Sequence, residues 1–394
     1  MKSASFKHFD PSRVPSPCFV VDEVAVENNL KTLRRVQDES GAKVLAALKA
    51  FSMWSLGPLV SRYLSGVCAS GVNEARLGRE AYGGEVHVFA AAYSEPDINT
   101  LLGLCNHLVF NSFSQWRRFG PQALAARARR PELAFGLRIN PEHSEGAVAI
   151  YDPCAPCSRL GITLAQFEAA TAEDNRCLEG ISGLHFHTLC EQGYQPLART
   201  LDVVEAKFGH LLPQIQWVNF GGGHHITAAD YAIDKLIARI REFATKYQVQ
   251  VYLEPGEAVA IHSGVLVAEV LDLSWNGLSQ AIVDTSATCH MPDVLEMPYR
   301  PGIRGAQAPD TTPYTYRLGG LTCLAGDVIG DYSFAAPLNI GDRLLFDDMS
   351  HYTMVKTSTF NGVNLPAIAL WNSDSDRLRL VKQFGYEDFK RRLS

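Results

Sequence analysis

The sequence predicts an α/β fold, in which a (β/α)8 TIM barrel is joined to a second, all-β domain. From Lys43 to Glu254, short apolar runs alternate with amphipathic stretches of helical period. Eight such strands, each beside a helix and spanning about two hundred residues, are typical of a closed barrel. After Gly256 the pattern changes to short strand-like runs broken by glycine, proline and aspartate, which indicates a β domain. A doubly wound open sheet remains the alternative, because periodicity does not show closure.

The expected elements follow from these runs. The barrel strands are residues 43–49, 67–70, 85–90, 107–112, 132–140, 181–187, 216–221 and 250–255. Helices are expected between most of them, with clear examples at residues 73–82, 95–105 and 228–247. The β domain is expected to contain strands at residues 259–273, 278–284, 314–318, 342–346 and 352–355. Residues 17–21 are also extended and can pair with that domain, and residues 297–312 form the longest expected loop. The predicted domains are therefore 23–256, and 1–22 plus 257–394.

Composition narrows the class of protein. The 394 residues are 46% hydrophobic and 20% charged, with a net charge of −6, so the basic footprint of a nucleic-acid-binding protein is absent. We expect no membrane partner, because no apolar run reaches spanning length. The N-terminal segment lacks the apolar core of a signal peptide. Nine cysteines, an odd number scattered along the chain, favour reduced thiols and a cytoplasmic location.

Two residues at expected strand ends suggest the chemistry. Lys49 closes the apolar run Val44–Leu48, where its ammonium would be desolvated and its amine would become a usable nucleophile toward an aldehyde. Glu254 closes the last barrel strand and is fixed by Pro255 and Gly256. A Schiff-base lysine and a carboxylate on a pyridine nitrogen are what pyridoxal phosphate (PLP) chemistry requires. We therefore expect PLP as the cofactor.

Other chemical candidates lie at the same ends of the expected strands. Gly221–Gly223 follow the seventh strand, where barrels commonly bind phosphate. His185 and His187 alternate on the sixth strand and point to one face. They are either hydrogen-bonded core histidines or metal ligands, and in the second case Cys154 with Cys157, or His224 with His225, would complete the set. A lone CxxC is a weak zinc signal, and we expect no metal.

The chain resembles the fold III PLP enzymes, the group of alanine racemase, ornithine decarboxylase and diaminopimelate decarboxylase, over almost its whole length. Within that group it is most similar to the carboxynorspermidine (carboxyspermidine) decarboxylases. The segments that carry the resemblance are Ala46–Phe51, Ala69–Glu74, Tyr151–Cys154 through Ser158–Gly161, His185–Glu191 and Met291–Pro301.

The resemblance implies a homodimeric PLP decarboxylase with shared active sites, acting on an α-amino acid with a polyamine tail. By this similarity Lys49 holds the cofactor, Glu254 pairs with its ring nitrogen and His185 stacks on its ring. The remaining cofactor-binding residues are Thr188, Gly222, Gly223, Gly256 and Tyr352. From the partner subunit come Cys323, as proton donor, and Asp327, as a substrate contact. Carboxylates that could bind the cationic tail are Asp293, Glu296, Asp152 and Glu145.

Three departures from the family pattern concern substrate recognition. The place of an arginine after Glu-Pro-Gly is taken by Glu257, so either this side chain turns away or another cation, such as a histidine, compensates. His187 stands where relatives have glycine, and Leu324 where they have aspartate. The alternatives are a decarboxylase or racemase of another amino acid, such as diaminopimelate or ornithine, on the same fold, and a non-catalytic PLP-binding regulatory protein.

Overall fold

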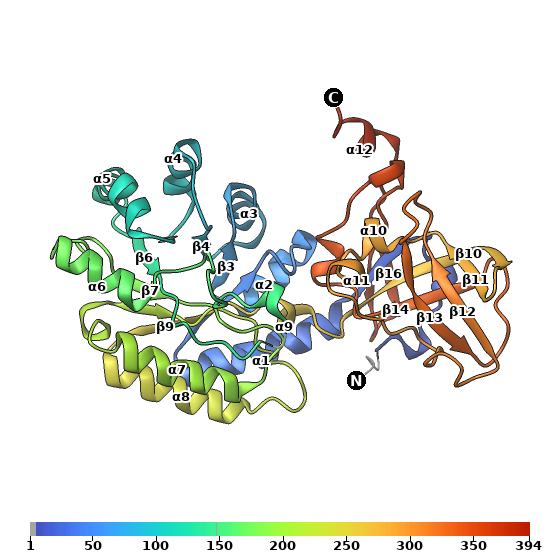
Figure 1. The fold of residues 1–394 in the computed structure, drawn as a ribbon, viewed down its shortest axis with the longest axis horizontal. Helices are drawn as coiled ribbons and strands as arrows, with labels where there is room; N and C mark the ends of the chain where they lie inside the picture. The colour runs from blue at the N-terminus through green and yellow to red at the C-terminus, as the bar shows by residue number, and fades with distance from the viewer. Residues whose placement is uncertain (1–4, 147) are drawn as a thin grey trace. The chain divides into compact units, whose positions relative to one another are not determined.

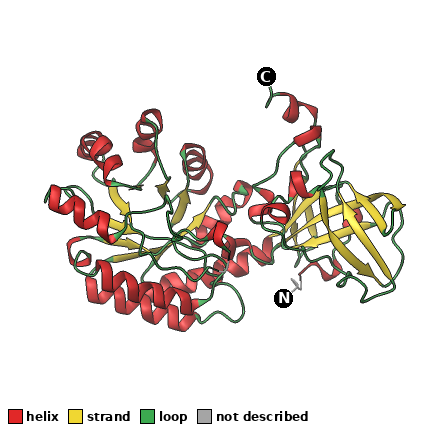
Figure 2. Ribbon diagram, viewed as in Figure 1, coloured by secondary structure: helices red, strands yellow, loops and turns green. Residues whose placement is uncertain are grey.

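The computed structural model describes residues 5–146 and 148–394. The chain divides into two compact units, of which one comprises residues 29–259 and the other residues 1–28 with 260–394. The boundaries fall within helices α1 (Glu23–Ser40) and α9 (Glu257–Ala260). The sequence analysis placed them at the first residues of the same two helices. Figures 1 and 2 show the barrel and the β-rich unit.

The first unit is a closed barrel of eight parallel strands, in the order β2 to β9. Its strands are β2 (Lys43–Ala47), β3 (Gly66–Ala69), β4 (Glu85–Phe89), β5 (His107–Phe110), β6 (Ala134–Arg138), β7 (Gly183–His185), β8 (Trp217–Asn219) and β9 (Gln250–Leu253). Pairing of Val44 in β2 with Leu253 in β9 closes the circle. This confirms the predicted barrel and excludes the open doubly wound sheet.

Helices connect successive barrel strands and surround them (Figure 1). They are α2 (Gly57–Tyr63), α3 (Val72–Leu77), which continues as a π-helix (Gly78–Tyr82), α4 (Glu95–Leu104), α5 (Phe113–Arg129), α6 (Leu164–Glu173), α7 (Tyr194–Phe208) and α8 (Ile233–Tyr247). Local sequence explains several starts: Ser94 and Thr163 cap α4 and α6 with reciprocal side-chain hydrogen bonds. The buried face of α8 carries Leu236, Ile237, Ile240 and Phe243 at helical spacing.

The second unit is built on a sheet of eight strands. Its strands are β1 (Cys18–Asp22), β10 (Gly264–Trp275), β11 (Ser279–Val283), β12 (Tyr314–Gly319), β13 (Val328–Phe334), β14 (Arg343–Asp347), β15 (Ala367–Asn372) and β16 (Arg377–Lys382). Two short helices, α10 (Ala287–His290) and α11 (Asp293–Glu296), follow β11, and α12 (Tyr386–Lys390) lies near the C-terminus. Strand β1 lies between β10 and β15, antiparallel to one and parallel to the other. The expectation that residues 17–21 pair with the β domain is confirmed.

Some β-domain elements differ from the prediction. Residues 352–355 were expected to be a strand, but Tyr352–Met354 form a 3₁₀ turn. The cause is local: Asp348 and Tyr352 adopt left-handed φ angles of 61° and 38°, which no strand tolerates. The expected strand at 259–273 begins only at Gly264, because α9 occupies its first residues. Residues 297–312 contain no helix or strand, as expected.

Candidate active site

Lys49 lies in a turn immediately after β2, at the C-terminal end of the barrel strands. Its side chain is exposed, so the expectation of a desolvated lysine is wrong for this conformation. The strand ends at Ala47, and the turn over residues 48–50 directs Lys49 away from the apolar neighbours that it follows in sequence. The Nζ atom lies 3.5 Å from Nε2 of His187. Position, rather than burial, is what makes this amine a candidate.

Glu254 follows β9, and its backbone N–H donates to the carbonyl of Gly221. The Oε1 atom accepts a hydrogen bond from Nδ2 of Asn219 at 2.7 Å, and Oε2 lies 3.2 Å from Nε2 of His185. Burial raises the pKa of this carboxyl, but the charge and hydrogen bond of His185 and the Asn219 amide outweigh burial and lower the pKa to about 2. Glu254 is therefore a buried carboxylate that stays ionised at neutral pH.

His185 and His187 lie at the same mouth of the barrel but have different partners. His185, the last residue of β7, is stacked on Phe89 with ring centroids 5.4 Å apart, and burial lowers its pKa, against the attraction of Glu254. The Nδ1 atom of His187 accepts a hydrogen bond from the N–H of Gly222 at 3.1 Å. Its Nε2 atom therefore carries the hydrogen and faces Lys49. Burial also lowers the pKa of His187, so this ring is neutral.

The glycine run after β8 is packed against neighbouring backbone. A Cβ atom on Gly222 would lie 2.0 Å from the carbonyl oxygen of Glu254, and one on Gly223 would lie 1.9 Å from that of Leu189. Gly223 also has a φ of +85°, which favours glycine. Thr188, beside Leu189 in sequence, is buried, with its hydroxyl 3.4 Å from that of Thr200. Only glycine permits this approach.

Two further details concern the loop after Glu254. A Cβ atom on Gly256 would lie 2.8 Å from Cβ of Ala50, so this glycine lets the Pro-Gly turn approach the turn that carries Lys49. Glu257, which stands where relatives have arginine, forms an ion pair with His225, with Nε2 and Oε2 3.1 Å apart. A histidine therefore accompanies Glu257, and its expected role in compensating for the missing arginine stays a prediction.

In the β unit, Cys323 lies on an exposed turn, and its N–H donates to Oδ1 of Asn361 at 2.8 Å. Asp327, four residues later, is buried and accepts hydrogen bonds from the hydroxyls of Ser286 and Thr322, and from the N–H groups of Thr322 and Thr288. These contacts fix the ends of the turn that presents Cys323. The substrate contact expected of Asp327 stays a prediction.

The predicted tail-binding acids are engaged with other groups. Asp293 and Glu296 both contact the ammonium of Lys356, the second across 3.3 Å. Asp152 accepts from the N–H of Cys154 at 2.8 Å, and Glu145 accepts from Nε of Arg199 at 2.6 Å. Tyr352 is half-buried in its 3₁₀ turn. Their roles stay predictions.

Sequence reasoning missed two polar residues of this site. Asn219, the last residue of β8, orients Glu254, and Arg138, the last residue of β6, donates to the carbonyl of His187 at 3.1 Å. A polar residue ending an otherwise apolar barrel strand was the available signal. The alternative metal sets were not found: within residues 5–146 and 148–394, neither Cys154 with Cys157 nor the histidine pairs form a group with metal-ligand spacing.

The barrel residues fit PLP. An amine, a carboxylate held ionised at the end of the neighbouring strand, and a glycine run without side chains occur at one end of the barrel. These are the groups that bind the aldehyde, the ring nitrogen and the phosphate of this cofactor.

Comparison with known proteins gives the same result. Residues 18–350 match the family model described as pyridoxal-dependent decarboxylase, C-terminal sheet domain. The chain is 44% identical to carboxyaminopropylagmatine decarboxylase of Synechocystis sp., over 97% of this chain and 96% of the relative. It is 40% identical to carboxynorspermidine/carboxyspermidine decarboxylase of Campylobacter jejuni, over 96% and 99%. The crystal structure of the Campylobacter jejuni carboxynorspermidine decarboxylase with norspermidine superposes with a TM-score of 0.86, covering 96% of this chain and 100% of that one, at 39% identity. The chain therefore belongs to the pyridoxal-dependent decarboxylases, the fold III enzymes that use PLP to remove a carboxylate from an amino acid.

Proposed function

We propose that this enzyme decarboxylates carboxynorspermidine and carboxyspermidine, releasing norspermidine and spermidine in polyamine biosynthesis. The observation that carries the proposal is near-complete alignment with relatives that bear this activity in their names, at 40% and 37% identity. The solved relative with bound norspermidine supports it. The substrate is an α-amino acid whose tail carries a secondary and a primary ammonium.

The barrel residues have separate tasks in this reaction. When bound, PLP supplies an electron sink for the electron pair that the departing CO₂ leaves on the α-carbon. Lys49 would provide the amine that holds the cofactor aldehyde. Glu254 is ionised at neutral pH and so keeps the pyridine nitrogen protonated. Asn219 holds one oxygen of Glu254 in place through a hydrogen bond.

Arg300 and Arg304, the two arginines that follow Glu296 and could bind a second carboxylate, have other partners. Diaminopimelate has a distal carboxylate, which a guanidinium fork would recognise. Arg304 pairs with Asp347, with Nε and Oδ1 2.7 Å apart. Arg300 donates to the carbonyls of Gln307 and Asp331. Both guanidinium groups are thus engaged within their own unit, which favours a cationic tail.

Asp293 and Glu296 supply the matching charge. Their carboxylates converge on one ammonium, that of Lys356, in the arrangement that a substrate ammonium needs. We infer that the tail replaces Lys356 there. A charge-assisted hydrogen bond contributes roughly 1.5–3 kcal/mol. Two such contacts would give a preference of about 10²-fold or more over a shorter diamino acid.

Carboxyaminopropylagmatine is the second candidate substrate, because the relative named for it is 44% identical over 97% of the chain. Its tail ends in a guanidinium in place of an ammonium. Paired carboxylates can bind either a terminal ammonium or a terminal guanidinium. The planar guanidinium also requires two acceptor oxygens that lie side by side. Which end the site prefers is therefore decided by measurement of both compounds.

We further propose a homodimer with shared active sites. Cys323 is exposed on its turn, and it would protonate the α-carbon of a substrate in the active site that contains Lys49 of the second copy. One proton is consumed for each CO₂ released, so a donor at this carbon is required.

We also place the enzyme in the cytoplasm, because all nine cysteines are free thiols. No helix in the described part of the chain has the length and apolar character to cross a bilayer.

The test is CO₂ release from a panel of amino acids, with kcat/KM measured in competition. The panel contains carboxynorspermidine, carboxyspermidine, carboxyaminopropylagmatine, ornithine, lysine, arginine and diaminopimelate. We expect kcat/KM for a carboxylated polyamine to exceed the values for the last four compounds by about 10²-fold or more. Glu296→Gln should raise the KM for this polyamine, while the exposed control Asp374→Asn should not. Preference for diaminopimelate or ornithine would overturn the proposal, and absence of CO₂ from every compound would favour a regulatory PLP-binding protein.

A further inference from the structure

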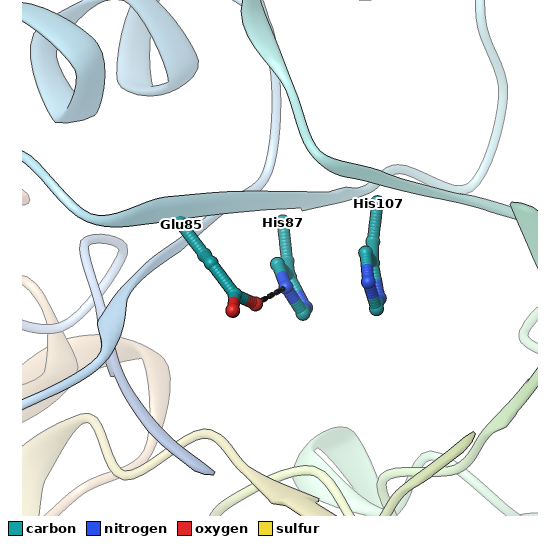
Figure 3. Close-up of side chains that lie close together, drawn as sticks. All are labelled: Glu85, His87 and His107. Atoms are coloured by element: carbon teal, nitrogen blue, oxygen red, sulfur yellow. Dashed lines mark hydrogen bonds and ion pairs between the residues drawn. The ribbon is translucent and has the colours of Figure 1, made fainter. Parts of the chain in front are cut away.

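Three further polar side chains lie close together on β4 and β5 (Figure 3), at the opposite ends of the strands from Lys49 and Glu254. Glu85 and His87 are the first and third residues of β4, and His107 is the first residue of β5. Lys49 and Glu254 follow the C-terminal ends of β2 and β9. The three residues therefore form a cluster that the decarboxylation chemistry does not use.

Each residue of this floor cluster, Glu85, His87 and His107, offers one potential ligand atom, and these atoms lie within 4.8 Å of one another. The Nε2 atom of His87 is 2.9 Å from Oε2 of Glu85. The rings of His87 and His107 are stacked, with centroids 3.8 Å apart and planes inclined by 18°. Ligand atoms around tetrahedral zinc are about 3.3 Å apart, and an imidazole lone pair lies in the plane of its ring, so binding one ion requires the two rings to turn out of their parallel arrangement.

His107 supplies a second, independent observation. The residue is only 8% exposed, and its Nδ1 atom is buried with no hydrogen-bond partner among the described residues. Buried polar atoms in native proteins are nearly always paired. An unpaired imidazole nitrogen beside a carboxylate and a second imidazole indicates that a ligand completes the group.

Glu85 is already held in the orientation that a metal ligand needs. Lys43 forms an ion pair with Oε1, which leaves Oε2 on the side of His87. The ammonium Nζ of Lys43 in turn lies over the ring of Tyr252, 5.6 Å from its centroid. Metal-ligating carboxylates are commonly held in this way by an outer partner. Lys43 contacts the oxygen that a monodentate ligand would not use.

We propose that Glu85, His87 and His107 form a binding site for a divalent transition-metal ion of the zinc class, with water as the fourth ligand. Two imidazoles and one carboxylate are the donor set that Zn²⁺ shares with neighbouring first-row metals. The ion takes the place of the hydrogen between His87 and Glu85, so His87 binds through Nε2 as a neutral ring. Four-coordination is completed without any residue from the catalytic end.

The site has a direct consequence for the enzyme. Among the influences on Glu254, the charge of His87 is one that lowers the pKa of this carboxyl, after burial, His185 and Asn219. A cation bound at the floor cluster would therefore add positive charge within electrostatic reach of the catalytic carboxylate. The ion would act as a structural support of the barrel that links β4 to β5.

The experiment measures zinc stoichiometry in the PLP-loaded enzyme. The protein is treated with EDTA, dialysed against ZnCl₂ and then against metal-free buffer, and zinc is determined by mass spectrometry. Glu85→Gln preserves the shape of the side chain, and His107→Phe preserves the ring stack. His262→Gln is the matched control, because it removes a histidine that pairs with Asp348 outside the cluster. Thermal unfolding with and without zinc is the second readout.

We expect about one equivalent more zinc in the wild type and in His262→Gln than in either cluster variant, with a zinc-dependent rise of Tm in the first two only. The nine cysteines can bind additional zinc, but such binding is common to all four proteins and cancels in the difference. Equal zinc content in the wild type and Glu85→Gln would overturn the proposal. Should His107→Phe fail to retain PLP, the isosteric Glu85→Gln decides alone.

Discussion

Asn219 donates a hydrogen bond from Nδ2 to Oε1 of Glu254, across 2.7 Å and between the ends of adjacent strands β8 and β9. This contact leaves the other oxygen, Oε2, facing His185 at 3.2 Å. The carboxylate is thus oriented from two sides, and burial does not neutralise it. A carboxylate fixed in this way can stabilise a positive charge on a bound ring without reorganising during the reaction.

Glu254→Gln should retain PLP and lose turnover. The amide keeps the shape of the side chain, but it cannot hold the pyridine nitrogen protonated, so the electron sink is weakened. We expect kcat to fall by about 10²-fold or more, as for the loss of other preorganised electrostatic groups. Steady-state kinetics with PLP content measured by absorbance test this, and Glu257→Gln, which removes the neighbouring carboxylate, is the control. Activity near that of the wild type would mean that the ring nitrogen has another partner.

Gly223→Ala should weaken PLP binding. A Cβ atom there would meet the carbonyl oxygen of Leu189 at 1.9 Å, and the φ of +85° adds backbone strain. The loop must shift, and we expect the Kd for PLP to rise about 10-fold or more, since each 1.4 kcal/mol of strain corresponds to a factor of ten. Gly193→Ala is the matched control, because a Cβ atom at Gly193 meets nothing within 4 Å. Equilibrium dialysis gives both constants, and equal values would show that the glycine run does not hold the cofactor.

The barrel could be predicted from the sequence because its strands are short apolar runs with helices between them. Local periodicity is enough to identify both kinds of element. It was insufficient where pairing is distant. Strands β13, β15 and β16 were not predicted. Strand β15 pairs with β1, with Cys18 opposite Ala367, and no turn in the sequence indicates a pairing between such distant segments. The 3₁₀ turn at Tyr352 was read as a strand, because a short apolar run fits either state until the left-handed φ is known.

The site was predictable to the extent that its residues end strands. Lys49, His185 and Glu254 were predicted in this way, since barrel chemistry gathers where strands end, and the structure places all three at or directly after strand ends. The exposure of Lys49 was not predicted, because it depends on the backbone geometry of the turn that follows Ala47. The floor cluster was missed because Glu85 and His107 begin strands, and only barrel closure and register bring β4 and β5 together. His87 pairs directly with His107 in that register.

Lys49 should be the residue that carries PLP. Its amine follows β2, next to the strand that leads to Glu254, and the neutral ring of His187 lies 3.5 Å away. Reduction of the enzyme with borohydride should fix the cofactor, and peptide mass mapping should find the pyridoxyl group on Lys49. Lys49→Ala should lose the PLP absorbance band and all activity, whereas Lys43→Ala should keep both. A label on a different lysine would refute the assignment.

His224 should make stability depend on pH. Burial, and then the charge of His225, lower the pKa of His224 from 6.5 to about 3, and its Nδ1 lies 2.6 Å from the hydroxyl of Tyr231. The unfolded chain therefore binds a proton below pH 6.5 that the folded chain does not bind until about pH 3. Stability falls as pH falls through this window, by up to about 1.4 kcal/mol per pH unit for one group.

Urea midpoints at pH 5, 6 and 7 measure the size of this effect. Replacement of His224 by asparagine lowers stability at every pH, because packing is lost, but it should flatten the decline between pH 7 and pH 5. Replacement of the exposed His210 should leave the decline as in the wild type. Parallel curves for the wild type and His224→Asn would show that His224 does not titrate between the two states in this way.

Hybrid dimers should recover activity from two inactive parents. In the shared-site proposal, Lys49 of one copy works with Cys323 of the other, so Lys49→Ala and Cys323→Ala proteins each lack one half of every site. Random exchange makes half of the dimers hybrids, and each hybrid has one intact site and one site without either group. The mixture should therefore regain about a quarter of the wild-type kcat, relative to total protein. Lys49→Ala mixed with the double variant Lys49→Ala/Cys323→Ala is the control and should regain nothing. If mass spectrometry shows that subunits have exchanged and the first mixture is still inactive, the proton donor and the lysine do not belong to different copies.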